Sequence, residues 1–283
     1  MIDLQNIHFG YKKSQPLFKG LNMQAPSGAI YGLLGSNGAG KSSLLKLISG
    51  LLSPQQGSVN VLDYSASSRD PRFLQELCYV PEDITTPTGT VAGYAKTYSA
   101  FYPRFDQAHF QFCLREFQVD GNKKFGDLSF GQKKKGILAF ALATRTRLLV
   151  LDEPTNGLDI PSKSQFRKLL AASLQDEQTY FISTHQVRDL GSLIDPIIVV
   201  DSGTIVFHES VERITDKLHF ELSRQGARSE DVIYEERVPG GYMILAENKG
   251  SEPSDLDLEI LFNAILNQRE RIRAIFSDDA SNE

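Results

Sequence analysis

One stretch, residues 34–47, constrains the fold and chemistry of this chain more than any other. It reads Leu-Gly-Ser-Asn-Gly-Ala-Gly-Lys-Ser-Ser-Leu-Leu-Lys-Leu and matches in full the phosphate-binding loop pattern of a glycine, four residues, then Gly-Lys-Ser. An apolar run at 29–34 precedes the loop, and apolar residues at helical spacing follow it over 43–51. We therefore expect the loop to join a buried strand to a helix.

The residue types of this loop indicate what it binds. Glycines let successive backbone N–H groups point at one anion, and the helix N-terminus adds partial positive charge. Lys41 would reach the β- and γ-phosphates of a nucleotide, and the Ser42 hydroxyl would hold Mg²⁺. The alternative is a glycine-rich turn before an ordinary helix, but background frequencies give roughly a 1% chance of such a match. The expected nucleotide contacts are Gly35, Ser36, Asn37, Gly38, Ala39, Gly40, Lys41, Ser42 and Ser43.

Composition limits the classes of protein to which the chain can belong. Its 283 residues, 41% of them hydrophobic, can bury one substantial core and a small satellite domain. A net charge of -5 argues against a large nucleic-acid interface, which normally shows as a basic surplus. Cys78 and Cys113 lie far apart without metal-ligand spacing, which favours buried thiols in a reducing compartment such as the cytosol.

No segment of the sequence is typical of a membrane protein. The first ten residues lack the layout of a signal peptide, and no apolar run approaches the roughly 20 residues that a membrane helix needs. If the protein works at a membrane, we expect another subunit to supply the membrane part.

Hydrophobic patterns predict an α/β core. The first two predicted strands alternate apolar and polar residues, which is typical of an antiparallel layer, whereas 148–151 is apolar throughout, as in a parallel sheet. The carboxyl end of that buried strand carries Asp152 and Glu153, and ligands of open α/β sheets bind at such ends. We expect strands at residues 1–9, 17–23, 29–34, 57–62, 77–80, 148–151, 179–183 and 197–200.

Two further segments have their own character. Residues 83–135 predict an aromatic-rich helical insertion, with Asp106 as the N-cap of one helix and aromatic side chains forming the insertion's own core. A helix opened by the glycine-rich residues 126–136 is expected to run to Thr144. After residue 206 the pattern indicates a small α+β appendix, with helices at 211–222 and 256–275 and strands at 231–234 and 241–245.

Four patterns in one order resemble an ATP-binding-cassette ATPase over residues 1 to about 206. They are the phosphate loop, Leu-Ser-Phe-Gly-Gln at 128–132, Leu-Asp-Glu-Pro-Thr at 151–155 with Gly-Leu-Asp at 157–159, and Ser-Thr-His at 183–185. The resemblance implies a P-loop NTPase core of mainly parallel sheet with an antiparallel β layer. It also implies a nucleotide-binding domain at 1–206, with the helical subdomain at about 83–135, and an accessory domain at 207–283.

The resemblance assigns roles to individual residues. Asp152 would bind Mg²⁺ through water, while Glu153 would be the general base that deprotonates the attacking water. His185 would contact the γ-phosphate of ATP and help to fix that water. Tyr11, in Phe-Gly-Tyr, is placed to stack on the nucleotide base, although a tyrosine filling a strand end is the plainer alternative.

The segment at 128–132 would bind a nucleotide held by a second molecule. Ser129, Gly131 and Gln132 match the signature motif, which in this family closes over the γ-phosphate bound to the opposite subunit. The hydroxyl, the backbone amides and the helix N-terminus would form an anion site. The resemblance therefore implies a head-to-tail homodimer, or a pair with another cassette subunit, around two ATP molecules, with residues 157–159 crossing the interface.

Two residues depart from the family pattern. Phe130 stands where many members carry glycine, and we expect its side chain to point outward. Glu82 stands where a glutamine usually coordinates Mg²⁺, so it adds a negative charge beside the triphosphate while remaining able to ligate the metal. The alternative for Glu82 is a solvated loop carboxylate. The run Lys133–Lys135 is expected to be the solvated face of the signature helix rather than a nucleic-acid patch.

The preferred hypothesis is the ATP-hydrolysing subunit of a transporter. It would work with a membrane-embedded permease, bind no nucleic acid and sit in the cytoplasm at the inner face of the cell membrane. Its appendix favours export over import, and the transported substrate cannot be named from this chain. A soluble cassette ATPase that acts on ribosomes or DNA is the alternative, but such relatives carry two cassettes or a long coiled coil. A binding module without hydrolysis is disfavoured because Lys41, Asp152, Glu153 and His185 are all present.

Overall fold

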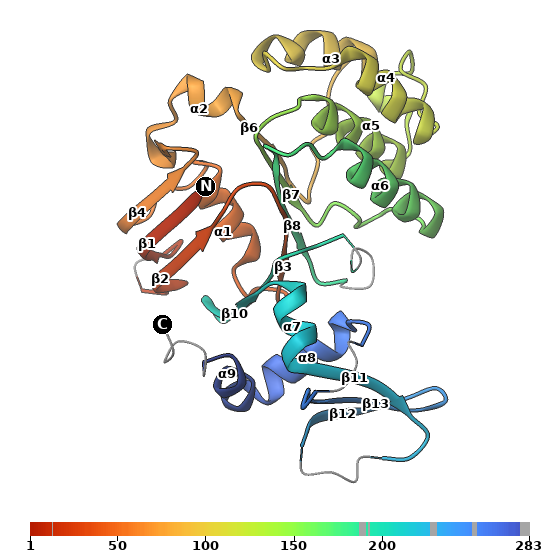
Figure 1. The fold of residues 1–283 in the computed structure, drawn as a ribbon. Helices are drawn as coiled ribbons and strands as arrows, with labels where there is room; N and C mark the ends of the chain where they lie inside the picture. The colour runs from red at the N-terminus through yellow and green to blue at the C-terminus, as the bar shows by residue number, and fades with distance from the viewer. Residues whose placement is uncertain (13, 187–190, 192, 227–230, 251–253, 278–283) are drawn as a thin grey trace.

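A six-stranded sheet forms the centre of the computed structural model, which describes residues 1–12, 14–186, 191, 193–226, 231–250 and 254–277. Its strand order is β10-β9-β3-β8-β7-β6, and only β10 runs antiparallel to its neighbour (Figure 1). The predicted mainly parallel core is therefore confirmed. The strands are β3 (Ile30–Leu34), β6 (Leu77–Val80), β7 (Leu148–Asp152), β8 (Thr179–Thr184), β9 (Ile197–Asp201) and β10 (Thr204–Glu209).

The central sheet is buried on both faces because its strands are apolar throughout. In β7, Leu149 and Leu151 join one hydrophobic core while Leu148 and Val150 join the other, as the alternation of side chains along a strand requires. One face packs against α1 (Lys41–Ile48) and a second sheet. The opposite face packs against α5 (Phe130–Ala143) and α6 (Ile160–Ser173).

The predicted antiparallel layer is confirmed as a four-stranded sheet with the order β2-β1-β4-β5. Alternate residues of its first strand are buried, which explains the alternating pattern in the sequence. This sheet lies beside α1, away from the helical insertion (Figure 1). Its strands are β1 (Ile2–Phe9), β2 (Phe18–Ala25), β4 (Gln56–Val61) and β5 (Tyr64–Ser65), and α2 (Pro71–Gln75) follows them.

The helical insertion contains α3 (Val91–Tyr98), α4 (Gln107–Glu116) and the start of α5. Asp106 caps α4 as predicted, since its side chain accepts a hydrogen bond from His109 N at 2.8 Å. Phe110 is fully buried, and the ring of Phe140 packs against three other aromatic rings of this region. The expectation that the aromatic residues form the insertion's core is confirmed for the buried rings, whereas Tyr98 and Phe101 are exposed.

The appendix is an α+β unit, but two of its predicted helices are wrong. Residues 211–222 are not one helix, because α7 (Val211–Lys217) ends where the strand β11 (Leu218–Ser223) begins. Residues 256–275 form two helices, α8 (Leu258–Asn267) and α9 (Arg269–Ser277), separated at Gln268. The two predicted strands are confirmed as β12 (Val232–Val238) and β13 (Gly241–Glu247), in a sheet with the order β11-β13-β12.

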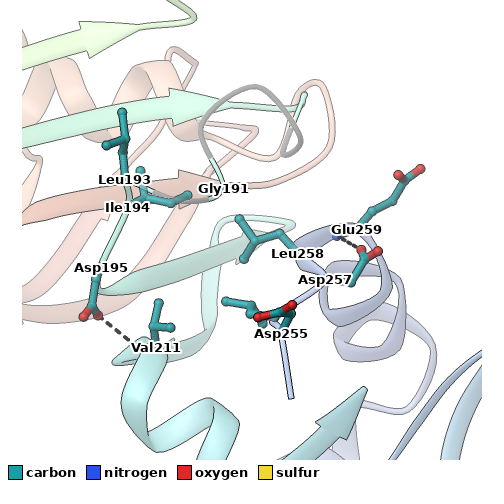
Figure 2. A pocket seen from close by; sticks show the side chains of 10 residues that line it. Gly191, Leu193, Ile194, Asp195, Val211, Asp255, Asp257, Leu258 and Glu259 are labelled. Atoms are coloured by element: carbon teal, nitrogen blue, oxygen red, sulfur yellow. Dashed lines mark hydrogen bonds between the residues drawn. The ribbon is translucent and has the colours of Figure 1, made fainter. Parts of the chain in front are cut away.

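The appendix is joined to the cassette through a shared core and a polar contact. Phe207 of β10, Ile214 of α7 and Leu261 of α8 belong to the same hydrophobic cluster as the central sheet. At the junction lies a cleft of about 660 Å³ between the chain before β9 and the start of α8 (Figure 2). There Asp195 accepts a hydrogen bond from the backbone N–H of Val211 at 2.9 Å. The division expected after residue 206 falls inside β10.

Candidate functional site

Four neighbouring strands deliver the predicted site residues to one edge of the central sheet. The phosphate loop follows β3, His185 follows β8, Asp152 and Glu153 end β7, and Glu82 follows β6. Because these strands are parallel and adjacent in the order β3-β8-β7-β6, their carboxyl ends meet at the same edge. The topology therefore converts four segments that are distant in sequence into one site.

The phosphate loop holds its lysine against its own backbone. Gly40 directly precedes α1 with a φ of 115°, a conformation that residues with a Cβ rarely adopt. The Lys41 ammonium donates to the carbonyl oxygens of Gly35 at 2.8 Å and Ser36 at 3.3 Å. Since Lys41 is buried, these contacts fix its charge at the mouth of the loop.

Glu153 lies at the centre of the charged groups. Its carboxylate Oε1 is 3.5 Å from the Lys41 Nζ and 2.9 Å from His185 Nδ1. Its backbone has a positive φ of 46°, and its N–H donates to Ser183 Oγ at 3.0 Å. Such strained backbone occurs where surrounding contacts hold it, and here it turns the side chain toward the phosphate loop.

Asp152 is held by two hydroxyl groups. Ser183 Oγ donates to Oδ1 of Asp152 at 2.6 Å, and the Tyr79 hydroxyl donates to Oδ2 at 3.3 Å. The register of β7 and β8 pairs Asp152 directly with Ser183, which explains the short contact. Burial, and next the charge of Asp152, raise the pKa of Tyr79 well above its ordinary value, so this hydroxyl keeps its proton.

Asn156 connects the segment after β7 to the segment after β6. Its amide Nδ2 donates to Glu82 Oε1 at 2.7 Å, and its Oδ1 accepts from Gln186 Nε2 at 3.4 Å. Lys163 in turn donates to Gln186 Oε1 at 2.7 Å. Glu82 is thus held at the cleft by an amide, which disfavours a freely solvated carboxylate, and its role as a metal ligand stays a prediction.

The expectation for the lysine run is wrong at its middle residue. Lys134 is fully buried, and its Nζ donates to the carbonyl oxygens of Glu153 at 2.8 Å and Asn156 at 2.9 Å. Burial lowers the pKa of Lys134, while the nearby carboxylates, Glu82 foremost, act in the opposite sense. Lys133 and Lys135 are partly exposed, so within the lysine run the expectation of a solvated face holds for these two residues.

The signature segment begins α5 as a capping box. Ser129 Oγ accepts from the Gln132 N–H at 3.3 Å, and the Gln132 side chain accepts from the Ser129 N–H at 3.1 Å. Phe130 is 53% exposed, which confirms that its side chain points outward. Its ring packs against Gly157, where a Cβ would lie only 2.4 Å from Cε1.

A cleft of about 850 Å³ opens beside the phosphate loop. The Tyr11 ring is 66% exposed at this cleft, with its hydroxyl 3.0 Å from Ser43 Oγ and its edge against Phe9, so stacking on a base stays a prediction. As far as the described residues go, the cleft is not lined by Ser129, Gly131 or Gln132. Its lining residues are Tyr11, Lys12, Gln15, Pro16, Leu17, Asn37, Gly38, Gly40, Lys41, Ser42, Ser43, Glu82, Glu153, Asn156 and His185.

The donor set at this edge fits a hard divalent cation. Ser42, Asp152 and Glu82 offer only oxygen atoms, which Mg²⁺ prefers. Asp152 is 2% exposed, and within the described part of the chain it forms no ion pair. Since a buried carboxylate needs a compensating positive charge, a metal ion beside Asp152 would supply it.

Sequence reasoning missed several polar residues that hold the site together. Ser183, Asn156 and Gln186 each lie within three residues of a predicted site residue, so nearness to a motif was their signal. The sequence carried a stronger signal for Lys134. It stands three and four residues before Ile137 and Leu138, which places it on the buried face of α5.

Comparisons with known proteins point in one direction. Residues 18–156 match the family model described as ABC transporter. The chain is 34% identical to the Nod factor export ATP-binding protein I of Burkholderia orbicola, over 71% of this chain and 68% of that protein. It is 28% identical to the zinc uptake system ATP-binding protein ZurA of Listeria monocytogenes, over 82% of this chain and 95% of that protein.

Solved structures share the fold. An ATP-binding cassette, solved as a dimer in a post-hydrolysis state with ADP and phosphate, superimposes with a TM-score of 0.66 at 22% identity. The similarity covers 75% of this chain and 99% of that cassette. The predicted fold class is confirmed by this likeness and by the arrangement of the sheets.

Proposed function

Since the chain belongs to the ABC transporter family, as one of its ATP-binding ATPases, we propose that it hydrolyses ATP to drive a separate membrane-embedded permease. The observation that carries this proposal is the meeting of Lys41, Glu153 and His185 at one cleft beside a phosphate loop. A phosphate-binding cation and a base lie there within reach of the same bound group.

In this proposal ATP binds with its phosphates in the loop. The backbone amides of residues 35–43 and the Lys41 ammonium neutralise the β- and γ-phosphates. Tyr11 stacks on the base. The support for these roles is the position of Lys41, which lies buried at the loop mouth.

Glu153 is the proposed general base. Its carboxylate accepts a proton from the attacking water, whose oxygen bonds to the γ-phosphorus while the bond to the β-phosphate oxygen breaks, giving ADP and phosphate. His185 lies 2.9 Å from the same carboxylate, so it orients the base and faces the γ-phosphate. Lys41 compensates the negative charge of Glu153 until the phosphates arrive.

Ser42, Asp152 and Glu82 are the proposed residues that hold Mg²⁺. The bound metal ion neutralises phosphate charge during the reaction. Asp152 is pre-oriented for this role by Ser183 and Tyr79, and Glu82 by Asn156. Because Glu82 adds a carboxylate, Glu82→Gln should change the Mg²⁺ concentration that half-maximal turnover requires. An unchanged Mg²⁺ dependence would remove Glu82 from this set.

The protein is proposed to act as a head-to-tail homodimer around two ATP molecules. Ser129, Gly131 and Gln132 bind the γ-phosphate held by the second copy. This arrangement is supported by the cleft, whose described lining lacks these three residues. ATP then closes the dimer and hydrolysis reopens it, which gives the permease a gate.

The permease is proposed to be an exporter, with this subunit bound at the inner face of the membrane. Among the described helices, none combines the length and the apolar character needed to cross a bilayer. The support for export is the higher identity of the Burkholderia orbicola relative, an export protein by name, at 34% over 208 residues, against 28% over 249 residues for the Listeria relative named for zinc uptake.

Two measurements test this function. The purified protein with ATP and Mg²⁺ should release phosphate, and Lys41→Ala should abolish the release. Affinity purification from membranes should recover a polytopic membrane protein together with this chain. Phosphate release together with an affinity purification that recovers no membrane protein would favour a soluble ATPase. No phosphate release would favour a module that only binds nucleotide.

A further inference from the structure

The buried Lys134 is not used by the proposed reaction. It lies in the first half of α5, far from the phosphate loop in sequence, and it is 0% exposed. Burying a lysine in a protein interior is unfavourable unless its charge and its hydrogen bonds are compensated. The partners of Lys134 therefore indicate why the chain carries it.

Its hydrogen bonds tie α5 to the turn that presents Glu153. The Nζ of Lys134 donates to the carbonyl oxygens of Glu153 and Asn156, at 2.8 and 2.9 Å. These two residues also form a turn, since Asn156 N donates to Glu153 O at 3.2 Å. Because Glu153 has a φ of 46°, this turn needs support from outside, and Lys134 supplies it.

Asn156 links Lys134 to the acidic departure from the family pattern. Its carbonyl oxygen accepts from Lys134, while its side-chain amide donates to Glu82 Oε1 at 2.7 Å. Both charged residues thus contact the same asparagine, one through its backbone and the other through its side chain. The ammonium and the carboxylate of Glu82 carry opposite charges at the same edge of the sheet.

We infer that Lys134 is a positioning residue that fixes the Glu153 turn and compensates the negative charge of Glu82 through the shared Asn156. Lys134 does not itself line the cleft in the described structure, whereas Glu153 and Asn156, which accept its hydrogen bonds, do. This role rests on the proposed ATPase function, because Lys134, on the signature helix α5, compensates the charge of Glu82 beside the nucleotide. The signature helix and the general base are thereby held in one network.

A double-mutant cycle tests this coupling without nucleotide. Lys134→Gln is expected to lower Tm by roughly 5 °C or more with Glu82 present, because it removes the compensating charge. In the Glu82→Gln background the same substitution is expected to lower Tm by less than about half that amount. The matched control is Lys133→Gln, a partly exposed neighbour with the same charge change, which should shift Tm by about 1 °C or less.

The results of this cycle either support or overturn the coupling between Lys134 and Glu82. Equal Tm losses in the two backgrounds overturn the coupling. If Lys134→Gln does not fold beside Glu82, folding of the double variant supports the inference and its failure to fold overturns it. A second measurement is the KM for ATP, which Lys134→Gln is expected to raise. The factor of this increase should be at least about threefold smaller in the Glu82→Gln background than with Glu82 present. Absence of ATP hydrolysis in the unmodified protein would refute the proposed function but leave the Tm cycle intact.

Discussion

At the residue scale, the geometry around Glu153 supports its proposed role as the general base of turnover. Its carboxylate contacts both Lys41 and His185, whereas the carboxylate of Asp152 is occupied by two hydroxyl donors. Glu153 therefore lines the cleft, as its proposed role of base requires, while the two hydroxyl groups orient Asp152 for its proposed role as a metal ligand. Asp152 is the last residue of β7 and Glu153 follows it with a φ of 46°, so the two adjacent side chains have different surroundings and can divide these two tasks.

The first prediction removes the base and keeps its shape. Glu153→Gln should lower kcat for ATP hydrolysis by about 100-fold or more, since a general base contributes at least that factor, while ATP still binds. Phosphate release measures the loss, and the binding of a fluorescent ATP analogue measures retained affinity. Glu177→Gln, on an exposed turn away from the cleft, is the control. Normal hydrolysis by Glu153→Gln would refute the assignment.

The second prediction concerns Gly157, which has a φ of +76° and lies against the Phe130 ring. Gly157→Ala should lower the free energy of unfolding by about 1–2 kcal/mol from backbone strain, plus the displacement of the ring. Gly89→Ala is the matched control, because Gly89 has a φ of +81° but open space around it. Urea denaturation should show a larger loss for Gly157→Ala than for Gly89→Ala. Adding Phe130→Ala to Gly157→Ala should recover only the part of the loss that exceeds that of Gly89→Ala. Equal losses at the two glycines would mean that the ring contact is unimportant.

At the scale of elements, the sequence predicts best where one pattern dominates a segment. The strand at 148–151 is apolar throughout and is present as β7, and the helix expected to run to Thr144 is present as α5, which ends at Ala143. The loop at 35–42 has residue types that few other structures tolerate. Convergence of these segments on one edge also followed from the sequence, because parallel strands place their carboxyl ends together.

The segments that were predicted wrongly have a weaker or mixed pattern. Residues 218–222 carry Leu, Phe and Leu at alternate positions directly after α7, so a strand signal merges with a helical one. The break between α8 and α9 falls at Gln268, where neither glycine nor proline marks it. The carbonyl groups that accept from Lys134 belong to a distant turn, so no local pattern contains its partners, although helical spacing indicates its burial.

The third prediction tests the packing of α8. Leu261 is fully buried in the core cluster, so Leu261→Ala should lower the free energy of unfolding by about 2–5 kcal/mol. Leu266→Ala, in the same helix but 38% exposed, makes the same chemical change and should lower it by less than about 1 kcal/mol. Thermal or urea unfolding followed by circular dichroism compares the two. Similar losses would contradict the packing of α8 described above.

At the scale of the whole molecule, one hydrophobic cluster runs from the insertion through the central sheet into the appendix. Val199 of β9 and Leu261 of α8 both belong to it. The accessory domain at 207–283 therefore stays a proposal, and its shared core with the cassette argues against separate folding. A shared core couples the two parts in unfolding, so calorimetry should show a single main transition. Two well-separated transitions would mean that the appendix folds on its own.

The last prediction is the assembly itself, because neither the cleft nor the signature segment completes a nucleotide site within the described single chain. Glu153→Gln with ATP and Mg²⁺ should shift from monomer to dimer in light scattering after size exclusion, since ATP binds but is not consumed. Adding Lys41→Ala should keep it monomeric by removing the phosphate contact, and Ser129→Arg should do so by blocking the opposite half-site. A dimer that forms equally without ATP would contradict ATP-driven closure.

Mixing the Lys41→Ala and Ser129→Arg chains, both on the Glu153→Gln background, tests the head-to-tail geometry. A head-to-tail pair would then retain one intact site, formed by Lys41 of the second chain and Ser129 of the first, and should dimerise weakly where neither chain does alone.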